Sequence, residues 1–177
     1  MKRYILTGTS GAGKTSIIRF LENMGHCVIH EAATDIIASE QASGIIKPWD
    51  DISFIDKIVD LQKQRQLQAS GELQFFDRVA FDTYALSMYL DYAPSITLLE
   101  EIKRINEEKT YEKKVFFIEN LGFCKKTPIR QISYEEALRF EKIHEEVYKS
   151  YGYELVRIVP QQIEQRVNKI VNLVAGC

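Results

Sequence analysis

Cysteine and histidine are both scarce in this chain of 177 residues, which contains three of each. The cysteines are odd in number, lie far apart and match neither a CxxC pair nor a zinc-ligand spacing; they are Cys27, Cys124 and Cys177. A disulfide-stabilised secreted domain and a structural zinc module are therefore disfavoured. Reduced thiols fit a cytoplasmic protein best, and this is the localisation that we expect.

Long apolar runs and a strong charge of one sign are also missing. No stretch approaches the ~18 uninterrupted apolar residues that a membrane span needs, and the first apolar run, residues 4–6, is too short for a signal peptide. The formal net charge is -2, whereas nucleic-acid coats and membrane-surface proteins are usually strongly basic. We therefore expect neither a membrane nor a nucleic acid as partner, and the oligomeric state stays open.

The sequence does contain a regular alternation of short apolar runs with longer amphipathic stretches, which is typical of βαβ units. Its length and its 45% of hydrophobic residues fit one domain, residues 1–177, with a sizeable core. Strands are expected at residues 4–7, 27–30, 73–76, 114–118 and 154–159, the second of them buried. Helices are expected at 14–24, 32–43, 53–69, 82–90, 95–109, 133–151 and from 160 onwards, and Ser133 with Glu136 has the spacing of a capping box. The pattern predicts an α/β fold, a three-layer αβα sandwich around a five-stranded parallel sheet.

The stretch GTSGAGKT, between the first expected strand and the first helix, matches the phosphate-binding pattern GxxxxGK[ST] in full. Its glycines allow successive backbone N–H groups to surround a phosphate, and the helix that follows adds the positive end of its dipole. Lys14 would reach the β- and γ-phosphates of ATP, and the Thr15 hydroxyl would bind Mg²⁺. The residues predicted to bind the nucleotide are Gly8, Thr9, Ser10, Gly11, Ala12, Gly13, Lys14, Thr15 and Ser16.

Charged residues follow two other strands, and ligands of such sheets bind at the carboxyl ends of the strands. Asp77 comes after the third strand, where a carboxylate can hold Mg²⁺ as a Walker-B aspartate does. Arg78 offers a fork of donors to a transferred phosphoryl group. Glu31, after the second strand, has the position of a general base for an acceptor hydroxyl. These residues also have interpretations without catalysis: Asp77 and Arg78 as an ion pair at a strand end, and Glu31 as an acid in the first turn of a helix.

The segment 120–132 is longer than a usual loop and carries several cations, which favours a lid that closes over the site. Arg130 is its best candidate for an arginine that stabilises charge during transfer, whereas Lys125 and Lys126 are more simply solvated. Glu119, after the fourth strand, is an alternative to Asp77 as the acid that organises metal and water. If Glu119 had this role, hydrolysis would be favoured over transfer.

The quoted motifs also carry a family resemblance over essentially the whole chain. GTSGAGKTSIIRFLENMGHCVIHEAATDII, FFDRVAFDTYAL and YGYELVRI resemble small P-loop proteins described as AAA-type ATPase domains. These are related to the ribosylnicotinamide kinase domains of bacterial NAD-biosynthesis regulators and, more distantly, to deoxynucleoside kinases. The resemblance implies a sheet of order 2-3-1-4-5, Glu31 as base, Asp77 and Arg78 as an acid–arginine pair, and Arg130 as a lid arginine. Those kinases usually have Glu-Pro and Glu-Arg-Ser where this chain has Glu31-Ala32 and Asp77-Arg78-Val79.

These observations favour an ATP- and Mg²⁺-dependent kinase that acts on a small-molecule acceptor related to a nucleoside or nucleotide. Its catalytic residues would be Lys14, Glu31, Asp77, Arg78 and Arg130. The alternatives are a regulatory NTPase that hydrolyses ATP or switches a protein partner, and a module that binds ATP without chemistry. A Ras-like GTPase is disfavoured because the NKxD signature is missing, and the sequence does not identify the acceptor.

Overall fold

The computed structural model describes residues 1–8, 11–121 and 133–176, and strands alternate with helices along this part of the chain. The elements are β1 (Lys2–Thr7), α1 (Lys14–Asn23), β2 (Cys27–Ile29), α2 (Ala32–Ala42), the 3₁₀ turn η1 (Pro48–Asp50), α3 (Ser53–Gln68), β3 (Leu73–Asp77), α4 (Ala80–Tyr89), α5 (Ile96–Glu107), β4 (Lys114–Ile118), α6 (Tyr134–Ser150), β5 (Glu154–Ile158) and α7 (Ile163–Ala175).

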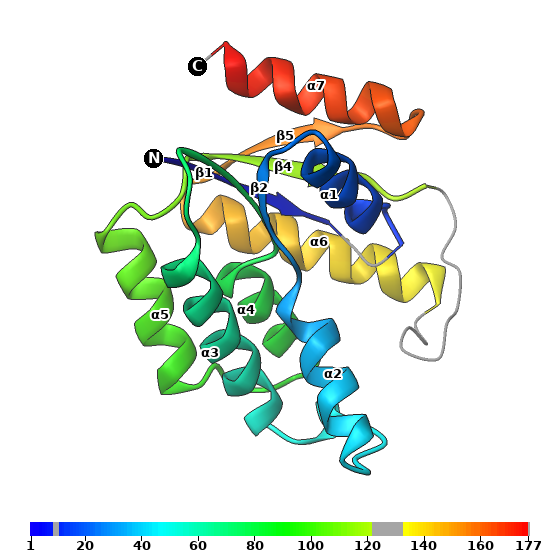
Figure 1. The fold of residues 1–177 in the computed structure, drawn as a ribbon. Coiled ribbons are helices and arrows are strands. Elements are labelled where there is room, and N and C mark those ends of the chain that lie inside the picture. The colour runs from blue at the N-terminus through cyan, green and yellow to red at the C-terminus, as the bar shows by residue number, and fades with distance from the viewer. Residues whose placement is uncertain (9–10, 122–132, 177) are drawn as a thin grey trace.

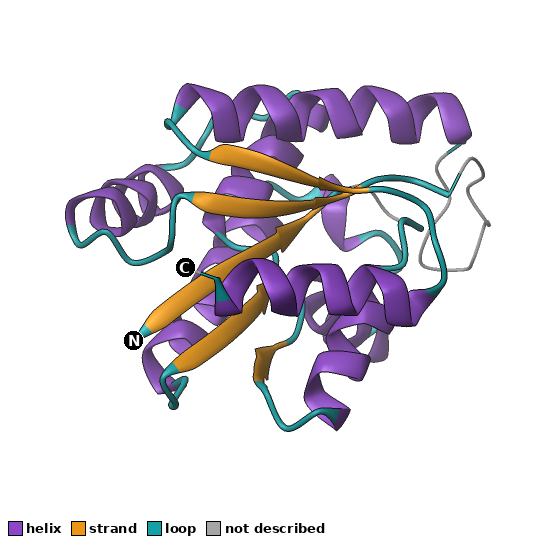
Figure 2. Ribbon diagram, turned by 90° about the horizontal axis from the view of Figure 1, so that it is seen from above, coloured by secondary structure: helices purple, strands orange, loops and turns teal. Residues whose placement is uncertain are grey.

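The five strands form one parallel sheet in the order β2-β3-β1-β4-β5 (Figures 1 and 2). This is the order that the family resemblance implies. The central strand β1 lies between β3 and β4, and Leu6 is in register with both Asp77 and Phe116. The carboxyl ends of the three strands therefore meet beside the residue that begins the phosphate-binding loop.

Alternating side chains of the strands divide the core into two layers. Tyr4 and Leu6 face α1 and α7 on one side of the sheet, whereas Ile5 faces the other side, which α3, α4, α5 and α6 cover (Figure 1). Helix α1 packs through Ile17, Ile18 and Leu21, which are fully buried; Leu21 lies one turn after the other two. Burial of each such side chain contributes about 1.5–3 kcal/mol, so these layers fix the sheet edge that carries the site.

Local capping explains where two helices begin. Helix α4 starts at Ala80, two residues earlier than predicted, because the Asp82 carboxylate accepts a hydrogen bond from the Val79 N–H (2.9 Å). The predicted capping box at Ser133 is confirmed: the Ser133 Oγ accepts from the Glu136 N–H (3.2 Å), and the Glu136 carboxylate accepts from the Ser133 N–H (2.6 Å).

Two other expectations differ from the structure. Helix α7 begins at Ile163 and not at Pro160, because residues 159–162 connect it to β5 in non-helical conformation. Strand β2 is half-buried, whereas a buried strand is predicted, because it pairs only with β3 at the edge of the sheet. Within the described residues, no helix combines the length and the apolar character needed to cross a membrane.

Candidate active site

The phosphate-binding loop leaves β1 in a conformation that only glycine fits. Gly8 has φ +125°, and a Cβ atom there would lie 2.3 Å from the Ile118 carbonyl oxygen of β4. Gly11 and Gly13 also have positive φ (+89° for both), and Gly13 is the N-cap of α1. The loop therefore lies directly on the carboxyl end of the sheet and leads into a helix N-terminus. Thr9 and Ser10 fall outside the described residues.

Lys14 begins α1 and turns back toward the loop. Its Nζ donates a hydrogen bond to the Gly8 carbonyl oxygen (2.8 Å), and the side chain is buried. Burial, followed by the nearby charge of Arg78, lowers the Lys14 pKa to about 8, although Asp77 and Glu31 oppose this change. Lys14 therefore remains mostly protonated at neutral pH, and both positively and negatively charged side chains surround it.

A small cavity of about 190 Å³ joins the loop to the predicted catalytic residues. It is lined by Gly11, Gly13, Lys14, Thr15, Ser16, Glu31, Asp77 and Arg78. The fold thus brings together residues from the loop, from the start of α2 and from the end of β3. The structure confirms that these predicted residues are neighbours. Arg130 and most of the predicted lid lie outside the described residues.

Asp77 is the last residue of β3 and is almost completely buried, at 4% exposure. Burial raises its pKa to about 6, although the charge of Lys14 opposes the shift. Within the described part of the chain its Oδ1 has no hydrogen-bond partner. Asp77 and Thr15 line the same cavity, and such a buried carboxylate oxygen is suited to a hard cation such as Mg²⁺, which takes a few protein oxygens and completes its shell with water and phosphate.

Glu31 and Arg78, which both line this cavity, form an ion pair at 3.0 Å. Arg78 adopts a left-handed backbone (φ +69°), which is unfavourable for an L residue by about 1–2 kcal/mol. Its N–H donates to the Leu6 carbonyl oxygen (3.1 Å), and its Nη2 donates to that of Gly8 (3.2 Å). The second Glu31 carboxylate oxygen accepts from the Thr34 hydroxyl (2.7 Å). Both charged groups are therefore fixed beside the loop.

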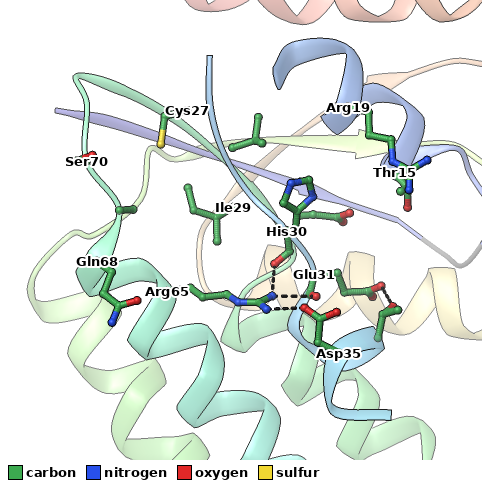
Figure 3. Close-up of a pocket in the computed structure, with 14 residues that line it drawn as sticks. Thr15, Arg19, Cys27, Ile29, His30, Glu31, Asp35, Arg65, Gln68 and Ser70 are labelled. Atoms are coloured by element: carbon green, nitrogen blue, oxygen red, sulfur yellow. Dashed lines mark hydrogen bonds and ion pairs between the residues drawn. The ribbon is translucent and has the colours of Figure 1, made fainter. Parts of the chain in front are cut away.

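A second, larger hollow of about 690 Å³ adjoins the cavity and shares Thr15, Glu31 and Asp77 with it. It extends along β2 between α1, the start of α2 and the end of α3, as Figure 3 shows. The hollow therefore lies between the Glu31 segment and the C-terminal end of α3. Arg78 lines the smaller cavity but is not among the residues that line the hollow.

Arg65 of α3 anchors the backbone around Glu31, and sequence reasoning did not assign it a role. Its Nη1 donates to the carbonyl oxygens of His30 (2.9 Å) and Glu31 (3.1 Å), and its Nη2 donates to the Asp35 carboxylate (2.5 Å; Figure 3). Asp35 is an exposed residue, but it is paired with Arg65. The contacts fix the start of α2 and hence the position of the Glu31 side chain.

Asp82 is the centre of a buried polar network that the sequence did not reveal. Its carboxylate accepts hydrogen bonds from the hydroxyls of Thr7 and Tyr148, the second at 2.5 Å, besides capping α4. His144 lies 3.5 Å away, but burial lowers its pKa to about 4, so at neutral pH this contact is not an ion pair. The network ties α6 to the strand ends on which the loop and Arg78 depend. Its only signal in the sequence was an acid in the first turn of a helix.

Arg166 of α7 is a second buried polar residue that sequence reasoning did not single out. Its Nη1 donates to the Ala12 carbonyl oxygen (2.9 Å), and its Nη2 donates to that of Glu119 (3.3 Å). In the sequence, its special position was indicated only by the apolar residues around it. Ile163, Val167 and Ile170 recur at helical spacing around Arg166 and place it on the apolar face of the helix.

Glu119, the alternative organiser of the metal, points elsewhere. Its carboxylate accepts from Arg157 Nη1 (3.1 Å), and Arg157 also pairs with Glu145 of α6 (2.7 Å). Glu119 does not line the small cavity. Among the described residues, no group of three or more His, Cys, Asp or Glu side chains could hold a metal ion by itself.

Comparisons with known proteins agree with this architecture. The structure resembles deoxyadenosine kinase from M. mycoides with bound dATP (TM-score 0.66, 16% identity) and the same kinase with the products dCMP and dCDP (TM-score 0.65, 17% identity). Both matches cover 99% of this chain and 100% of the kinase chain.

NadR protein in complex with NR is also similar, with a TM-score of 0.62 and 16% identity, over 98% of this chain and 50% of the NadR chain. At these identities the likeness establishes the fold alone. No curated protein sequence matches the chain. The profile of the AAA domain family matches residues 3–166, which span every strand and the loop that binds phosphate. The chain therefore belongs to the AAA domain family, and its fold is that of P-loop kinases.

Proposed function

We propose that this protein is a kinase that transfers the γ-phosphoryl group of ATP to a hydroxyl group of a small-molecule acceptor. The observation that carries the proposal is the Glu31–Arg78 ion pair, 3.0 Å long, in the cavity that Lys14 and the loop also line. A hydrolase needs an oriented water molecule, whereas a carboxylate and a guanidinium fixed next to an adjoining hollow suit a second substrate.

The donor would bind with its phosphates on the loop. The N-terminus of α1 would face the phosphates, and Lys14 can exchange its bond to the Gly8 carbonyl for bonds to the β- and γ-phosphates. Thr15 and Asp77 would hold Mg²⁺ there, which neutralises charge on the phosphates when it is bound. The buried Asp77 Oδ1, which has no hydrogen-bond partner among the described residues, supports this assignment.

Transfer would use Glu31 as base and Arg78 as charge stabiliser. The acceptor oxygen forms a bond to the γ-phosphorus while the bond from this phosphorus to the β–γ bridging oxygen breaks, so that ADP leaves. The acceptor hydroxyl gives its proton to the Glu31 carboxylate, which accepts a hydrogen bond from Thr34, while Arg65 fixes the Glu31 backbone through its carbonyl oxygen. Arg78 remains charged at any physiological pH and can donate to the γ-phosphoryl oxygens. We also assign a charge-stabilising role to Arg130.

The size of the hollow supports an acceptor of nucleoside or nucleotide size. At about 690 Å³ it falls within the range of small-molecule sites. Its lining combines apolar side chains of β2, such as Val28 and Ile29, with the polar side chains of Thr34 and Gln68. The deoxyadenosine kinase and the NadR protein, whose structures hold dCMP and NR, have the same fold and support this acceptor class.

The test is ATP turnover with Mg²⁺, in the presence and absence of a panel of nucleosides, nucleotides and ribosylated metabolites, with product masses recorded. We expect acceptor-dependent turnover and a product heavier by one phosphate. Glu31→Gln should lower kcat by about 100-fold or more and leave ATP binding unchanged, because it removes the base and keeps the shape. Glu40→Gln is the matched control: Glu40 is also an acid of α2 but pairs with Lys57 away from the cavity.

Two results would contradict the proposal. ADP and free phosphate formed at one rate whatever the acceptor would favour the regulatory NTPase. Transfer at the wild-type rate by Glu31→Gln would show that Glu31 is only an acid at a helix start.

A further inference from the structure

Behind the phosphate-binding loop, α7 carries a buried arginine that takes no part in the chemistry above. Arg166 is only 2% exposed, and it bonds two backbone carbonyl groups, those of Ala12 in the loop and Glu119 after β4. Because 154 positions separate Arg166 from Ala12, this contact exists only in the folded chain. It fastens the loop to the end of the neighbouring strand.

The surroundings of Arg166 are unfavourable for a cation. Across residues 1–8, 11–121 and 133–176 its Nε has no hydrogen-bond acceptor, and no carboxylate forms an ion pair with it. Burial lowers the pKa of its guanidinium, and only the charge of Glu119 opposes this shift. A buried cation without a carboxylate partner destabilises a fold, so packing alone gives no reason for an arginine at this position.

The contact does fix the direction of one peptide group of the loop. In a planar trans peptide the Ala12 carbonyl and the Gly13 N–H point in opposite directions. With the Ala12 oxygen bonded to α7, the Gly13 N–H is directed away from α7, and Gly13 borders the small cavity. Glycine is favoured at position 13, since its φ is +89° and a Cβ atom would lie 3.1 Å from Arg166 Nη1.

We propose that Arg166 is a positioning residue of the triphosphate site, which holds the Ala12 carbonyl so that the Gly13 N–H can donate to a phosphate oxygen. A preorganised N–H requires no reorientation of the peptide when the ligand binds. The guanidinium also places a positive charge directly behind the loop, which favours an anionic ligand. The inference rests on the ATP binding in the proposed function, and it does not depend on the acceptor or on transfer.

The experiment measures the Kd of ATP with Mg²⁺ by calorimetry for wild type, Arg166→Met, Arg166→Lys and Arg157→Met. Arg157→Met is the matched control, because Arg157 is a cation near the same strand ends that pairs with Glu119 and Glu145 and not with the loop. We expect Arg166→Met to raise Kd about 10-fold or more, as expected for a lost hydrogen bond to a charged group. Arg166→Lys, which keeps the charge and one donor, should give an intermediate Kd, and the control should match wild type.

A second readout separates positioning from general stability. In protein labelled with ¹⁵N-glycine, the Gly13 amide resonance should shift when ATP and Mg²⁺ bind to wild type, and this shift should shrink in Arg166→Met but not in the control. Far-UV circular dichroism shows whether each variant folds. If Arg166→Met does not fold, Arg166→Lys decides: a higher Kd at unchanged melting temperature supports the proposal.

The outcomes distinguish the two proposals. If wild type binds no ATP, the proposed function fails and the role of Arg166 fails with it. If wild type binds ATP and the folded Arg166 variants bind it equally well, with the same Gly13 shift, the proposed function stands and the role of Arg166 is overturned.

Discussion

Replacing Asp77 with asparagine should change how the stability of the ligand-free protein depends on pH. Burial raises the pKa of the Asp77 carboxyl from 3.8 to about 6, even though Lys14 opposes the shift. The folded protein therefore holds this proton more tightly than the unfolded chain does. A change of about two pKa units corresponds to ~3 kcal/mol of unfolding free energy at most.

The sign follows from the direction of the shift. Because the folded pKa of Asp77 is raised, its contribution to stability is fully present below the unfolded pKa of 3.8 and is lost as the pH rises through about 6. Asparagine does not ionise and shows no such loss. The unfolding free energy of wild type minus that of Asp77→Asn should therefore fall by ~2 kcal/mol between about pH 4 and about pH 6.5.

Urea unfolding at a series of pH values, followed by circular dichroism, measures this difference. His144 also titrates in this range, with its pKa lowered to about 4, but it is present in both proteins and cancels. Asp60→Asn, which makes the same change at an exposed acid of α3, is the control for the substitution. A difference for Asp77→Asn that stays constant over this pH range would refute the reasoning, because it would mean that the Asp77 carboxyl is not desolvated.

Two further substitutions test the loop. Gly8→Ala should lower the unfolding free energy by about 2–4 kcal/mol, as measured by thermal or urea unfolding. The Cβ of the alanine would clash with the Ile118 carbonyl oxygen, and the backbone here has a φ of +125°. Gly44→Ala has a similar left-handed φ (+92°) but open space around the Cβ, so an equal loss in both variants would exclude the steric explanation. Lys14→Ala should keep the fold and weaken ATP binding by about 10-fold or more in calorimetry. Unchanged ATP affinity in that variant would contradict the assignment of the phosphate-binding loop.

The sequence by itself determined the elements and the loop, because both depend on local patterns. Apolar side chains at helical spacing located α1, and the glycine spacing of GTSGAGKT indicated a phosphate-binding turn between a strand and a helix. The positions of Glu31, Asp77 and Arg78 at strand ends also followed, since parallel strands bring their carboxyl ends to one edge. The order of the strands needed the family resemblance, because hydrophobic periodicity does not say which strands are neighbours.

Tertiary structure alone decided how these side chains are held and charged. The side chains that hold the site are far from it in the sequence. Arg65 is 34 positions from Glu31, Tyr148 is 66 positions from Asp82, and Arg166 is 154 positions from Ala12. No local pattern connects such distant residues. The raised pKa of Asp77 arises from burial under other elements, which sequence does not show. Glu119 illustrates the same limit. In the sequence, Glu119 and Asp77 both appear as an acid at the end of a strand, but in the fold the Glu119 carboxylate pairs with Arg157. Local sequence therefore named the candidate groups, whereas long-range packing selected among them and set their ionisation.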